Sequence, residues 1–273
     1  MSCEWQYISS KNNALVVRLA KLKDKKYRKV EGLFRFDGIK LFCEAAANGA
    51  PVKYVLVSES AAEKYKDTVE ESVTDAQLVV LADEAFSKMT DESSPEGIIT
   101  VCASLPGIVA LDKGCEDVLS GDTEKSTLML ESVRDTGNMG TIIRSARAFG
   151  IDRLVISSDC ADLYNPKTVR AAMGALFTQN IYVVESISDA VGAIRKRGSK
   201  VYAAALVRDA KRLGEAELKC GDAILIGNEG HGLSQSAIDA CDECIYIPME
   251  DGSESLNAGI AASVCMWEMY KVK

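Results

Sequence analysis

Three glycine-containing loops hold most of the polar residues that could do chemistry in this chain of 273 residues. The first loop, residues 135–150, turns on Gly137 and Gly140 and then enters a helical pattern that carries Arg144. Helix geometry places Arg144 about 200° round from Ile142, so its guanidinium should point away from the core. There it could hold an anionic ligand. An ordinary surface arginine fits the same pattern, and the loop alone leaves both interpretations open.

The second loop, residues 226–233, has three glycines within six residues directly after a predicted strand. Glycines permit positive φ and a close approach of the backbone to a ligand. This loop is not a P-loop, because no Gly-Lys-Ser/Thr follows, and its spacing fails the dinucleotide fingerprint. Glu229 lies inside the turn, which suggests a polar role toward a substrate or cofactor. His231, the only histidine of the chain, is better interpreted as a surface residue than as a catalytic base.

The third loop, residues 247–257, leads into the final predicted helix, and Ser255 and Asn257 bracket the start of that helix. Helix capping alone could account for either side chain. Cys241 and Cys244 form a lone CxxC motif shortly before this loop. No second cysteine pair and no further histidines accompany it, so we expect no metal site.

Strands must position these loops, and strand and helix patterns alternate from about residue 126 onward. The predicted strands are Thr127–Ser132, Arg153–Ser157, Ile181–Glu185, Lys200–Leu206, Ala223–Gly227 and Cys244–Met249. Near-continuous apolar strands separated by helices predict an α/β fold with a parallel sheet covered on both faces. Such sheets bind ligands at the carboxyl ends of their strands, where the three loops lie. A helix from Ser255 to Tyr270 is expected to end the chain.

The N-terminal part of the chain also predicts alternating helices and strands. The predicted elements are a helix near 38–48, a strand at Tyr54–Ser58, a helix near 60–72 and a strand at Gln77–Leu81. A less regular stretch with prolines and glycines follows at 105–124 and is expected to be a linker. We therefore expect a first domain at 1–104 and a second at 125–273.

The charge is unevenly distributed along the chain. The net charge is −8, but residues 1–50 hold ten Lys/Arg against five acids, whereas residues 51–100 hold four against eleven. A helix predicted over 13–29 would bury Leu15, Val16, Leu19 and Leu22. Its basic residues on another face are Arg18, Lys21, Lys25, Arg28 and Lys29. A solvated helix face and a phosphate-binding surface both fit this pattern.

Composition excludes several classes of protein. Hydrophobic residues make up 47% of the chain, which is ample for one or two cores and excludes a disordered protein. No apolar run approaches the roughly 18 residues that a membrane span needs. The first residues lack the basic and apolar regions of a secretory signal. Nine scattered cysteines, an odd number, are typical of reduced thiols, so we expect a cytoplasmic protein.

Together, the three loops resemble the SpoU (TrmH) family of RNA ribose methyltransferases, within the SPOUT superfamily. The first family motif is matched by Asn138, Gly140, Arg144, Ala146, Phe149 and Gly150. The second is matched by Gly227, Glu229, Gly230, Gly232 and Leu233. The third is matched by Ile247, Pro248, Met249, Ser255, Leu256 and Asn257. The segment 162–170, with Gly174 beyond it, is similar to the stretch between the first two motifs.

The N-terminal part has a weaker resemblance to the same proteins. Residues 28–103 look like the substrate-binding domain that precedes the catalytic domain in many members, through the stretches 36–38 and 95–98. Two positions depart from the family pattern. Asp37 stands where Glu is usual, and Thr136 stands where Pro commonly precedes the Gly-Asn pair. We expect the Thr136 departure to soften the turn without abolishing activity.

The resemblance implies a smaller L30e-like α/β domain followed by a parallel-sheet domain with a deep trefoil knot. It also implies a homodimer whose active site is completed near the subunit interface. The family binds S-adenosylmethionine within the knot, largely through backbone groups. Matched to this sequence, those contacts fall on Gly227, Ile247 and Leu256.

The implied reaction is methyl transfer to a ribose 2′-hydroxyl of RNA, and the family gives the first-motif arginine, Arg144, the central role. A guanidinium stays protonated in proteins, so we expect Arg144 to hold a phosphate and stabilise negative charge rather than act as a base. Four further residues, Asn138, Glu229, Ser255 and Asn257, would orient the ribose and Arg144. The expected substrate is large-subunit (23S) ribosomal RNA. Transfer RNA is the alternative substrate. A non-catalytic ribosome-assembly factor that retains the cofactor pocket is the alternative function.

Overall fold

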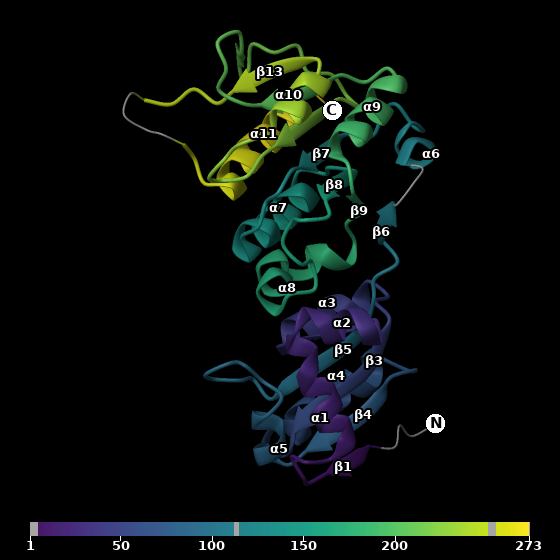
Figure 1. Cartoon of the computed structure of the whole chain (residues 1–273). Helices are drawn as coiled ribbons and strands as arrows, with labels where there is room; N and C mark the ends of the chain where they lie inside the picture. Colours follow the sequence, from purple (N-terminus) through teal and green to yellow (C-terminus); the bar gives the residue numbers. More distant parts are fainter. Residues whose placement is uncertain (1–4, 112–114, 251–254, 273) are drawn as a thin grey trace. The chain divides into compact units, whose positions relative to one another are not determined.

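The chain forms two compact units in a computed structural model, which describes residues 5–111, 115–250 and 255–272, without the side chains of 115 and 116. Unit 1 comprises Met1–Pro106 and Tyr164–Phe177, and unit 2 comprises Gly107–Leu163 and Thr178–Lys273. Figure 1 shows the elements of both units in sequence colours. No helix in the described part of the chain is long and apolar enough to cross a membrane.

Unit 1 is built on a five-stranded mixed sheet. Its strands are β1 (Gln6–Ile8), β2 (Leu33–Asp37), β3 (Val52–Ser58), β4 (Gln77–Leu81) and β5 (Ile98–Ala103). Their order is β1-β4-β3-β5-β2; β1, β4 and β3 are parallel, and β5 is antiparallel to both of its neighbours. Its helices are α1 (Ala14–Ala20), α2 (Lys25–Glu31), α3 (Ile39–Ala47), α4 (Ala62–Ser72), α5 (Asp83–Ser87) and α8 (Pro166–Ala172). Short 3-10 helices are η1 (Lys21–Lys23), η2 (Glu59–Ala61) and η3 (Met173–Phe177).

The single helix predicted over 13–29 is wrong. The segment forms α1, η1 and α2, and it breaks at Asp24, whose ψ of 131° is extended. The predicted apolar stripe is confirmed at three of its four residues, because Val16, Leu19 and Leu22 are fully buried, and Leu15 is half-buried. They pack with residues of β3, β4 and β5 in the core of unit 1.

Arg28 is a second correction to that prediction, because its side chain does not face solvent. The residue is only 6% exposed. Its Nη1 donates to the carbonyl oxygens of Leu22 at 2.8 Å and Lys23 at 2.5 Å. The guanidinium therefore satisfies carbonyl groups at the end of η1 that the broken helix leaves without partners.

The segment 164–177 packs in unit 1, although the sequence analysis places it inside the second domain. The Tyr164 ring lies 4.5 Å from that of Phe34, and the Phe177 ring lies 5.4 Å from that of Phe36. Arg170 forms an ion pair with Glu92. One face of β2 is thus covered by a connection between two strands of the other sheet.

Unit 2 contains an eight-stranded sheet in which every strand pair is parallel, which confirms the predicted sheet type. Its strands are β6 (Ile108–Leu111), β7 (Thr127–Leu130), β8 (Arg153–Ser157), β9 (Ile181–Val184), β10 (Val201–Ala204), β11 (Lys211–Arg212), β12 (Ala223–Ile226) and β13 (Glu243–Tyr246). Their order is β11-β13-β10-β12-β7-β8-β9-β6. Its helices are α6 (Cys115–Leu119), α7 (Thr136–Ala148), α9 (Ile187–Lys196), α10 (Gln235–Ala240) and α11 (Ala258–Lys271). The stretch expected to be a linker thus contributes β6 to the sheet edge and α6 to the covering helices.

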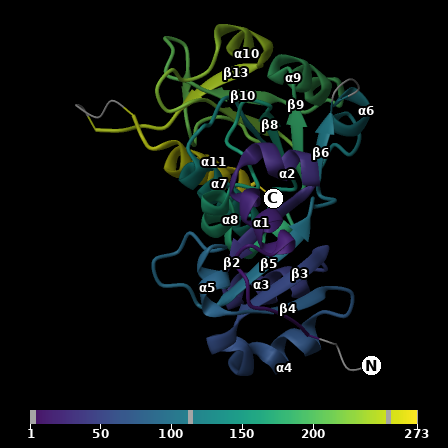
Figure 2. The ribbon, with the colours of Figure 1, turned by 60° about the horizontal axis from the view of Figure 1, so that its bottom comes forward.

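Helices cover both faces of the unit 2 sheet (Figures 1 and 2). On one face α9, α6 and α10 pack on alternate strand residues such as Met129, Val155 and Leu225. The intervening residues, such as Leu128 and Ile224, point to the opposite face, where α7 and α11 pack on each other and α11 packs on β12. The trefoil knot stays a prediction.

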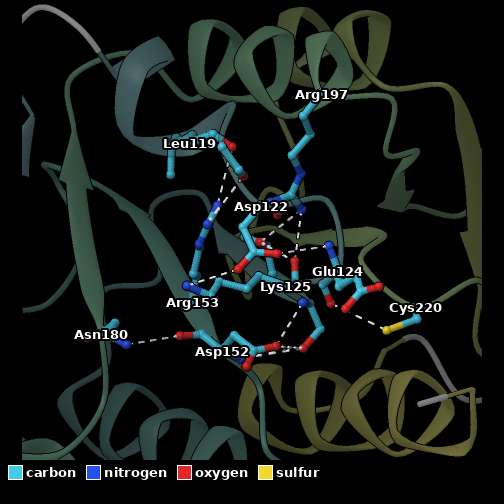
Figure 3. Close-up of polar contacts among 12 residues, drawn as sticks. Leu119, Asp122, Glu124, Lys125, Asp152, Arg153, Asn180, Arg197 and Cys220 are labelled. Carbon is cyan, nitrogen blue, oxygen red and sulfur yellow. Dashed lines mark hydrogen bonds and ion pairs between the residues drawn. The ribbon is translucent and has the colours of Figure 1, made fainter.

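Buried arginines hold the end of the sheet opposite to the predicted site (Figure 3). Arg197 is 8% exposed, and its Nη2 donates to the carbonyl oxygens of Lys125 at 2.9 Å and Gly221 at 2.7 Å. Its Nη1 donates to the Asp122 carbonyl at 3.2 Å, and Arg153 donates to that of Leu119 at 3.3 Å. These contacts hold the segment that precedes β7. They lie at the amino ends of the strands, so the carboxyl ends stay available for ligands.

Candidate active site

The first loop places Asn138 in the first turn of α7. Asp135 caps this helix, and its Oδ1 accepts a hydrogen bond from the backbone N–H of Asn138 at 2.7 Å. Thr136 is the first residue of α7. Proline is also favoured at that position of a helix, so the departure from the family pattern suits the same backbone.

The third loop delivers Asn257 to the same place. Its Oδ1 caps α11 by accepting hydrogen bonds from the N–H groups of Gly259 at 3.0 Å and Ile260 at 3.3 Å. Its Nδ2 remains available and donates to Oδ1 of Asn138 at 2.8 Å. Capping and the contact with Asn138 thus use opposite ends of one amide.

Glu229 of the second loop completes a chain of three side chains. Asn138 Nδ2 donates to Oε1 of Glu229 at 2.6 Å. The Asn138 amide therefore donates to one predicted site residue and accepts from another. The three residues come from loops that follow β7, β12 and β13, and we call them the Asn138–Glu229–Asn257 chain.

Packing of α7 against α11 holds this chain in register. Ser263 Oγ donates to Ser145 Oγ at 2.9 Å one step further along both helices. Beyond it the rings of Phe149 and Trp267 meet edge to face with centroids 6.0 Å apart. The two amides therefore lie at one end of a helix pair that is fixed at several points along its length.

Asn228 organises the glycine-rich loop, a role that the sequence analysis missed. Its Oδ1 accepts hydrogen bonds from the N–H groups of Gly230 at 2.8 Å and His231 at 3.3 Å. Its Nδ2 donates to the carbonyl of Ser132 at 2.7 Å, and its backbone pairs with that of Gly232. The side chain thereby ties the second loop to the start of the first. An amide between two glycines of a short loop was the signal available in the sequence.

A cavity of about 610 Å³ opens beside the Asn138–Glu229–Asn257 chain. Its walls include Ala204, Ala205, Leu206, Leu213, Ile226, Gly227, Asn228, Glu229, Gly230, Gly232, Ile245, Tyr246, Ile247, Met249, Ser255, Leu256, Ala258, Ala261 and Cys265. Most of this lining is apolar side chain or glycine backbone. Small-molecule and cofactor sites have this size and character.

Gly227 must be a glycine for the cavity to have this shape. A Cβ at this position would lie 2.4 Å from the carbonyl carbon of Gly232 and 2.5 Å from the backbone nitrogen of Leu233. Backbone thus crosses backbone at the cavity wall, which leaves peptide groups rather than side chains to face a ligand. These walls fit a nucleoside-sized cofactor that is held largely by backbone groups.

Electrostatics exclude a cysteine nucleophile from this cavity. Burial raises the pKa of Cys265 to about 12, so its thiol stays protonated at neutral pH. His231 is exposed and is not part of the lining. Among the lining residues that the structure describes, Glu229 carries a formal charge.

The structure brings together most of the predicted site residues but not all of them. The predicted cofactor contacts Gly227, Ile247 and Leu256 all line the cavity, as does Ser255. Arg144 is exposed on α7 and makes no hydrogen bond or ion pair with the described residues. Its guanidinium is therefore available to a further partner.

The predicted basic surface of unit 1 survives in part. Lys21, Lys25 and Lys29 are exposed. Arg18 is exposed too, but its Nη2 lies 2.6 Å from Oε2 of Glu31. With Arg28 buried, four of the five predicted residues remain at the surface.

Sequence reasoning also missed one wall of the cavity. Leu206 from the loop after β10, Leu213 directly after β11 and Ile245 of β13 belong to this wall. The rule that ligands bind after parallel strands covers the loop after β10, so that position was the available signal.

Comparison with known proteins supports one family. The sequence model of the SpoU rRNA Methylase family matches residues 125–267, and that of the MRM3-like substrate binding domain matches residues 13–100. The chain is 32% identical over 265 residues to the 23S rRNA (guanosine(2553)-2′-O)-methyltransferase RlmP of Bacillus subtilis strain 168, covering 96% of this chain and 98% of that protein.

Solved structures agree with the sequence matches. The SpoU methyltransferase AviRb from Streptomyces viridochromogenes, solved in complex with the cofactor AdoMet, is 25% identical with a TM-score of 0.82, covering 95% of this chain and 98% of that one. An AdoMet-bound rRNA methyltransferase from Sinorhizobium meliloti shares the fold, with 23% identity, a TM-score of 0.83 and 97% coverage of both chains. The first family match includes all three loops around the Asn138–Glu229–Asn257 chain, and the protein belongs to the SpoU rRNA methylase family.

Proposed function

We propose that this protein transfers a methyl group from S-adenosylmethionine to a ribose 2′-hydroxyl of large-subunit ribosomal RNA. The observation that carries the proposal is the Asn138–Glu229–Asn257 chain beside a cofactor-sized cavity. Three loops that are far apart in the sequence meet there, and each contributes a polar side chain that could orient a substrate.

The cavity walls fit the cofactor of the family. Gly227, Ile247 and Leu256 would hold it, because each lines the cavity and the glycine exposes backbone. When bound, S-adenosylmethionine supplies an activated methyl group on a sulfonium. The apolar walls around it, including Leu213 and Ile245, exclude water from its bound moiety.

The chain's own residues position the nucleophile. A ribose 2′-hydroxyl is a weak nucleophile at neutral pH, so it must be held in line with the methyl group. Ser255 and Glu229 line the cavity, and the hydrogen bond from Asn138 orients the Glu229 carboxylate. Because a guanidinium is a cation rather than a base in proteins, Arg144 holds the neighbouring phosphate and stabilises negative charge that develops on the 2′-oxygen.

The substrate class follows from the relatives and from unit 1. RlmP is named as a 23S rRNA 2′-O-methyltransferase and matches this chain over nearly its whole length. Unit 1 contains the match to a substrate binding domain and exposes Arg18, Lys21, Lys25 and Lys29. Cationic side chains on an otherwise acidic protein favour a local contact with RNA phosphates.

An exposed apolar surface on α11 supports the predicted homodimer. Ile260, Trp267 and Tyr270 are 54%, 48% and 49% exposed, and the last two rings stack with centroids 5.9 Å apart. Large clustered apolar side chains at the surface favour association with another protein. A second copy that covers this surface would approach α7, which carries Arg144.

The seven cysteines with described side chains are free thiols, which supports the predicted cytoplasmic location.

Transfer of labelled methyl from S-adenosylmethionine tests the proposal. Ribosomal subunits, free ribosomal RNA and transfer RNA that lack the modification would be tested separately, followed by nucleoside analysis. We expect a labelled 2′-O-methylnucleoside in large-subunit RNA. Label confined to transfer RNA would reassign the substrate. Cofactor binding without label in any RNA would indicate an assembly factor.

A further inference from the structure

A groove of about 360 Å³ lies on unit 1 between α1 and α2. It is lined by Asn12, Ala14, Val17, Arg18, Lys21, Tyr27 and Glu31. The break between the two helices creates it, because α2 folds back beside α1 instead of continuing it. A continuous helix over the same residues would have no such groove.

The groove combines an aromatic ring with apolar contacts and a polar rim. Tyr27, Ala14 and Val17 supply its apolar surface, and the Lys21 Nζ lies 5.4 Å from the centre of the Tyr27 ring. The ring is only half-buried, and its hydroxyl makes no hydrogen bond with any described residue. Within the described structure the ring contacts Lys21, whereas no hydrogen bond accounts for the hydroxyl at this position.

Charge around the groove favours an anionic partner. Residues 11–31 contain eight lysines and arginines against two acids. Among these cations, only Lys11, Arg18 and the buried Arg28 hold a hydrogen-bond or ion-pair partner within the described structure. The remaining cations are exposed and form no hydrogen bond or ion pair within the described ranges, and they are Lys21, Lys23, Lys25, Lys26 and Lys29.

The rim also carries groups that could contact the edge of a base. The Arg18 Nε and Nη2 both donate to Oε2 of Glu31, at 2.9 Å and 2.6 Å, so this pair is fixed in place. Asn12 is an exposed residue of the same lining. An amide and a fixed carboxylate beside an aromatic ring offer both donors and acceptors to a flat heterocycle.

We propose that this groove binds one unpaired nucleotide of the RNA, with its base stacked on Tyr27 and its phosphates held by the surrounding lysines. Bases splayed out of a helix stack on aromatic side chains in proteins that recognise single-stranded RNA segments. Base-paired RNA would offer only its phosphates, because its bases are already stacked. The inference rests on the proposed function only in taking RNA as the ligand.

Binding of two labelled RNAs to the full-length protein tests this proposal by fluorescence anisotropy without cofactor. The probes are a short single-stranded oligouridine and a blunt RNA duplex of the same length. We expect Tyr27→Leu to weaken binding of the single strand about tenfold, near the lower end of the loss that follows removal of a stacking aromatic. Tyr27→Phe should retain wild-type affinity because it keeps the ring. Affinity for the duplex should be the same in all three proteins.

A matched control exists on α4. The Lys64 Nζ lies 4.7 Å from the centre of the Tyr65 ring, so it makes the same kind of contact outside the groove. Lys21→Ala should weaken binding of both RNAs through the lost phosphate contact, whereas Lys64→Ala should change neither. Thermal melting checks that each variant is folded.

The outcomes separate this inference from the proposed reaction. Wild-type affinity of Tyr27→Leu for the single strand, or an equal loss on single strand and duplex, would overturn the stacking site. Methyl transfer by Tyr27→Leu at saturating RNA should keep its wild-type kcat, with the effect confined to the KM for RNA. If the wild-type protein transferred no methyl group but Tyr27→Leu still weakened single-strand binding, the proposed reaction would be refuted and the proposed stacking site would be supported.

Discussion

The amide of Asn257 donates a hydrogen bond to the Oδ1 of Asn138 at 2.8 Å, although 119 positions separate the two residues. Asn138 passes the contact on to Glu229 at 2.6 Å. Each amide can satisfy both neighbours in only one orientation, because its donor and acceptor ends differ. The orientation of the whole chain therefore depends on its central residue.

Replacement of Asn138 should disrupt this chain. Asn138→Ala removes the bridge, and we expect kcat for methyl transfer to fall about 10- to 100-fold, less than the loss of a direct oxyanion donor. Asn138→Asp should lower kcat further at neutral pH, because a second carboxylate would face Glu229. Its kcat should rise again as the pH falls and one of the two carboxylates is protonated. Steady-state kinetics across pH measure both effects. Asn48→Ala, an exposed amide of unit 1, is the control. An unchanged kcat in Asn138→Ala would remove Asn138 from the site.

Arg144 should act on turnover rather than on the cofactor. Its guanidinium is exposed, lies outside the cavity lining and is unpaired within the described residues. We expect Arg144→Ala to lower kcat by about 100-fold or more, on the scale of a lost charge-stabilising group. Cofactor Kd from calorimetry should stay within twofold (about 0.4 kcal/mol). Arg147→Ala, one turn further along the same exposed helix, supplies the control and should retain activity. Normal turnover in Arg144→Ala would refute the assignment.

Gly227→Ala should close the cavity wall. The new Cβ would lie 2.4 Å from backbone of Gly232, so one strand of the loop must move. We expect loss of measurable cofactor binding and a lower melting temperature. Gly192→Ala is the matched control, because nothing lies within 4 Å of its new Cβ in α9. That variant should gain about 0.5–1 kcal/mol of stability. Cofactor binding by Gly227→Ala with wild-type affinity would contradict the close approach.

Asp159 should contribute to stability in a pH-dependent way. Burial by itself raises the pKa of Asp159, but hydrogen bonds from Ser132 and Ser157 and the contact with Arg134 outweigh it and lower the pKa to about 2. A depressed carboxyl pKa stabilises the fold above the unfolded-state pKa, and that contribution is lost as pH falls toward the folded-state value.

The difference in melting temperature between the wild-type protein and Asp159→Asn measures this effect. The wild-type protein should melt higher at neutral pH, and the gap should narrow below about pH 4 and close toward pH 2. Glu215→Gln, which replaces an exposed carboxylate of unit 2, is the control variant. A gap that is constant from neutral pH to pH 2 would show that the charge of Asp159 is not what stabilises the fold.

The apolar surface of α11 should hold the predicted homodimer together. We expect Trp267→Glu to convert the protein to a monomer, because a charge in the middle of a buried interface is strongly disfavoured. Light scattering coupled to size-exclusion chromatography measures the mass. Val30→Glu, at a residue of unit 1 that is 76% exposed, should leave the mass unchanged. A wild-type monomer, or a dimer that survives Trp267→Glu, would place the interface elsewhere or remove it.

Local sequence patterns were enough to predict most strands of the unit 2 sheet and the loops that follow them. The strands β4 (Gln77–Leu81) and β8 (Arg153–Ser157) occupy the predicted residues, and the other predicted strands differ from the structure by a few residues at their ends. Alternation and apolar runs are properties of neighbouring residues, so they can be recognised without knowledge of the fold. The order of glycine and polar residues after those strands also located the loops that meet around the cavity.

Long-range packing decided the rest. The sequence analysis did not predict β2 and β5, whose residues become strands by pairing with each other across the sheet. The apolar stripe of the helix predicted over 13–29 ends at Leu22, and the residues beyond it are mostly charged. Periodicity alone therefore could not show the break at Asp24 that buries Arg28 and opens the groove beside Tyr27. The segment 164–177 follows β8 in the sequence, yet its aromatic residues pack on Phe34 and Phe36 of unit 1.

The site shows the same division. Its residue types could be recognised in the sequence, because side-chain chemistry is local. Which amide faces which carboxylate could not, because hydrogen bonds between Asn138, Glu229 and Asn257 require three strand ends to meet at one sheet edge. Only the tertiary structure brings those ends together.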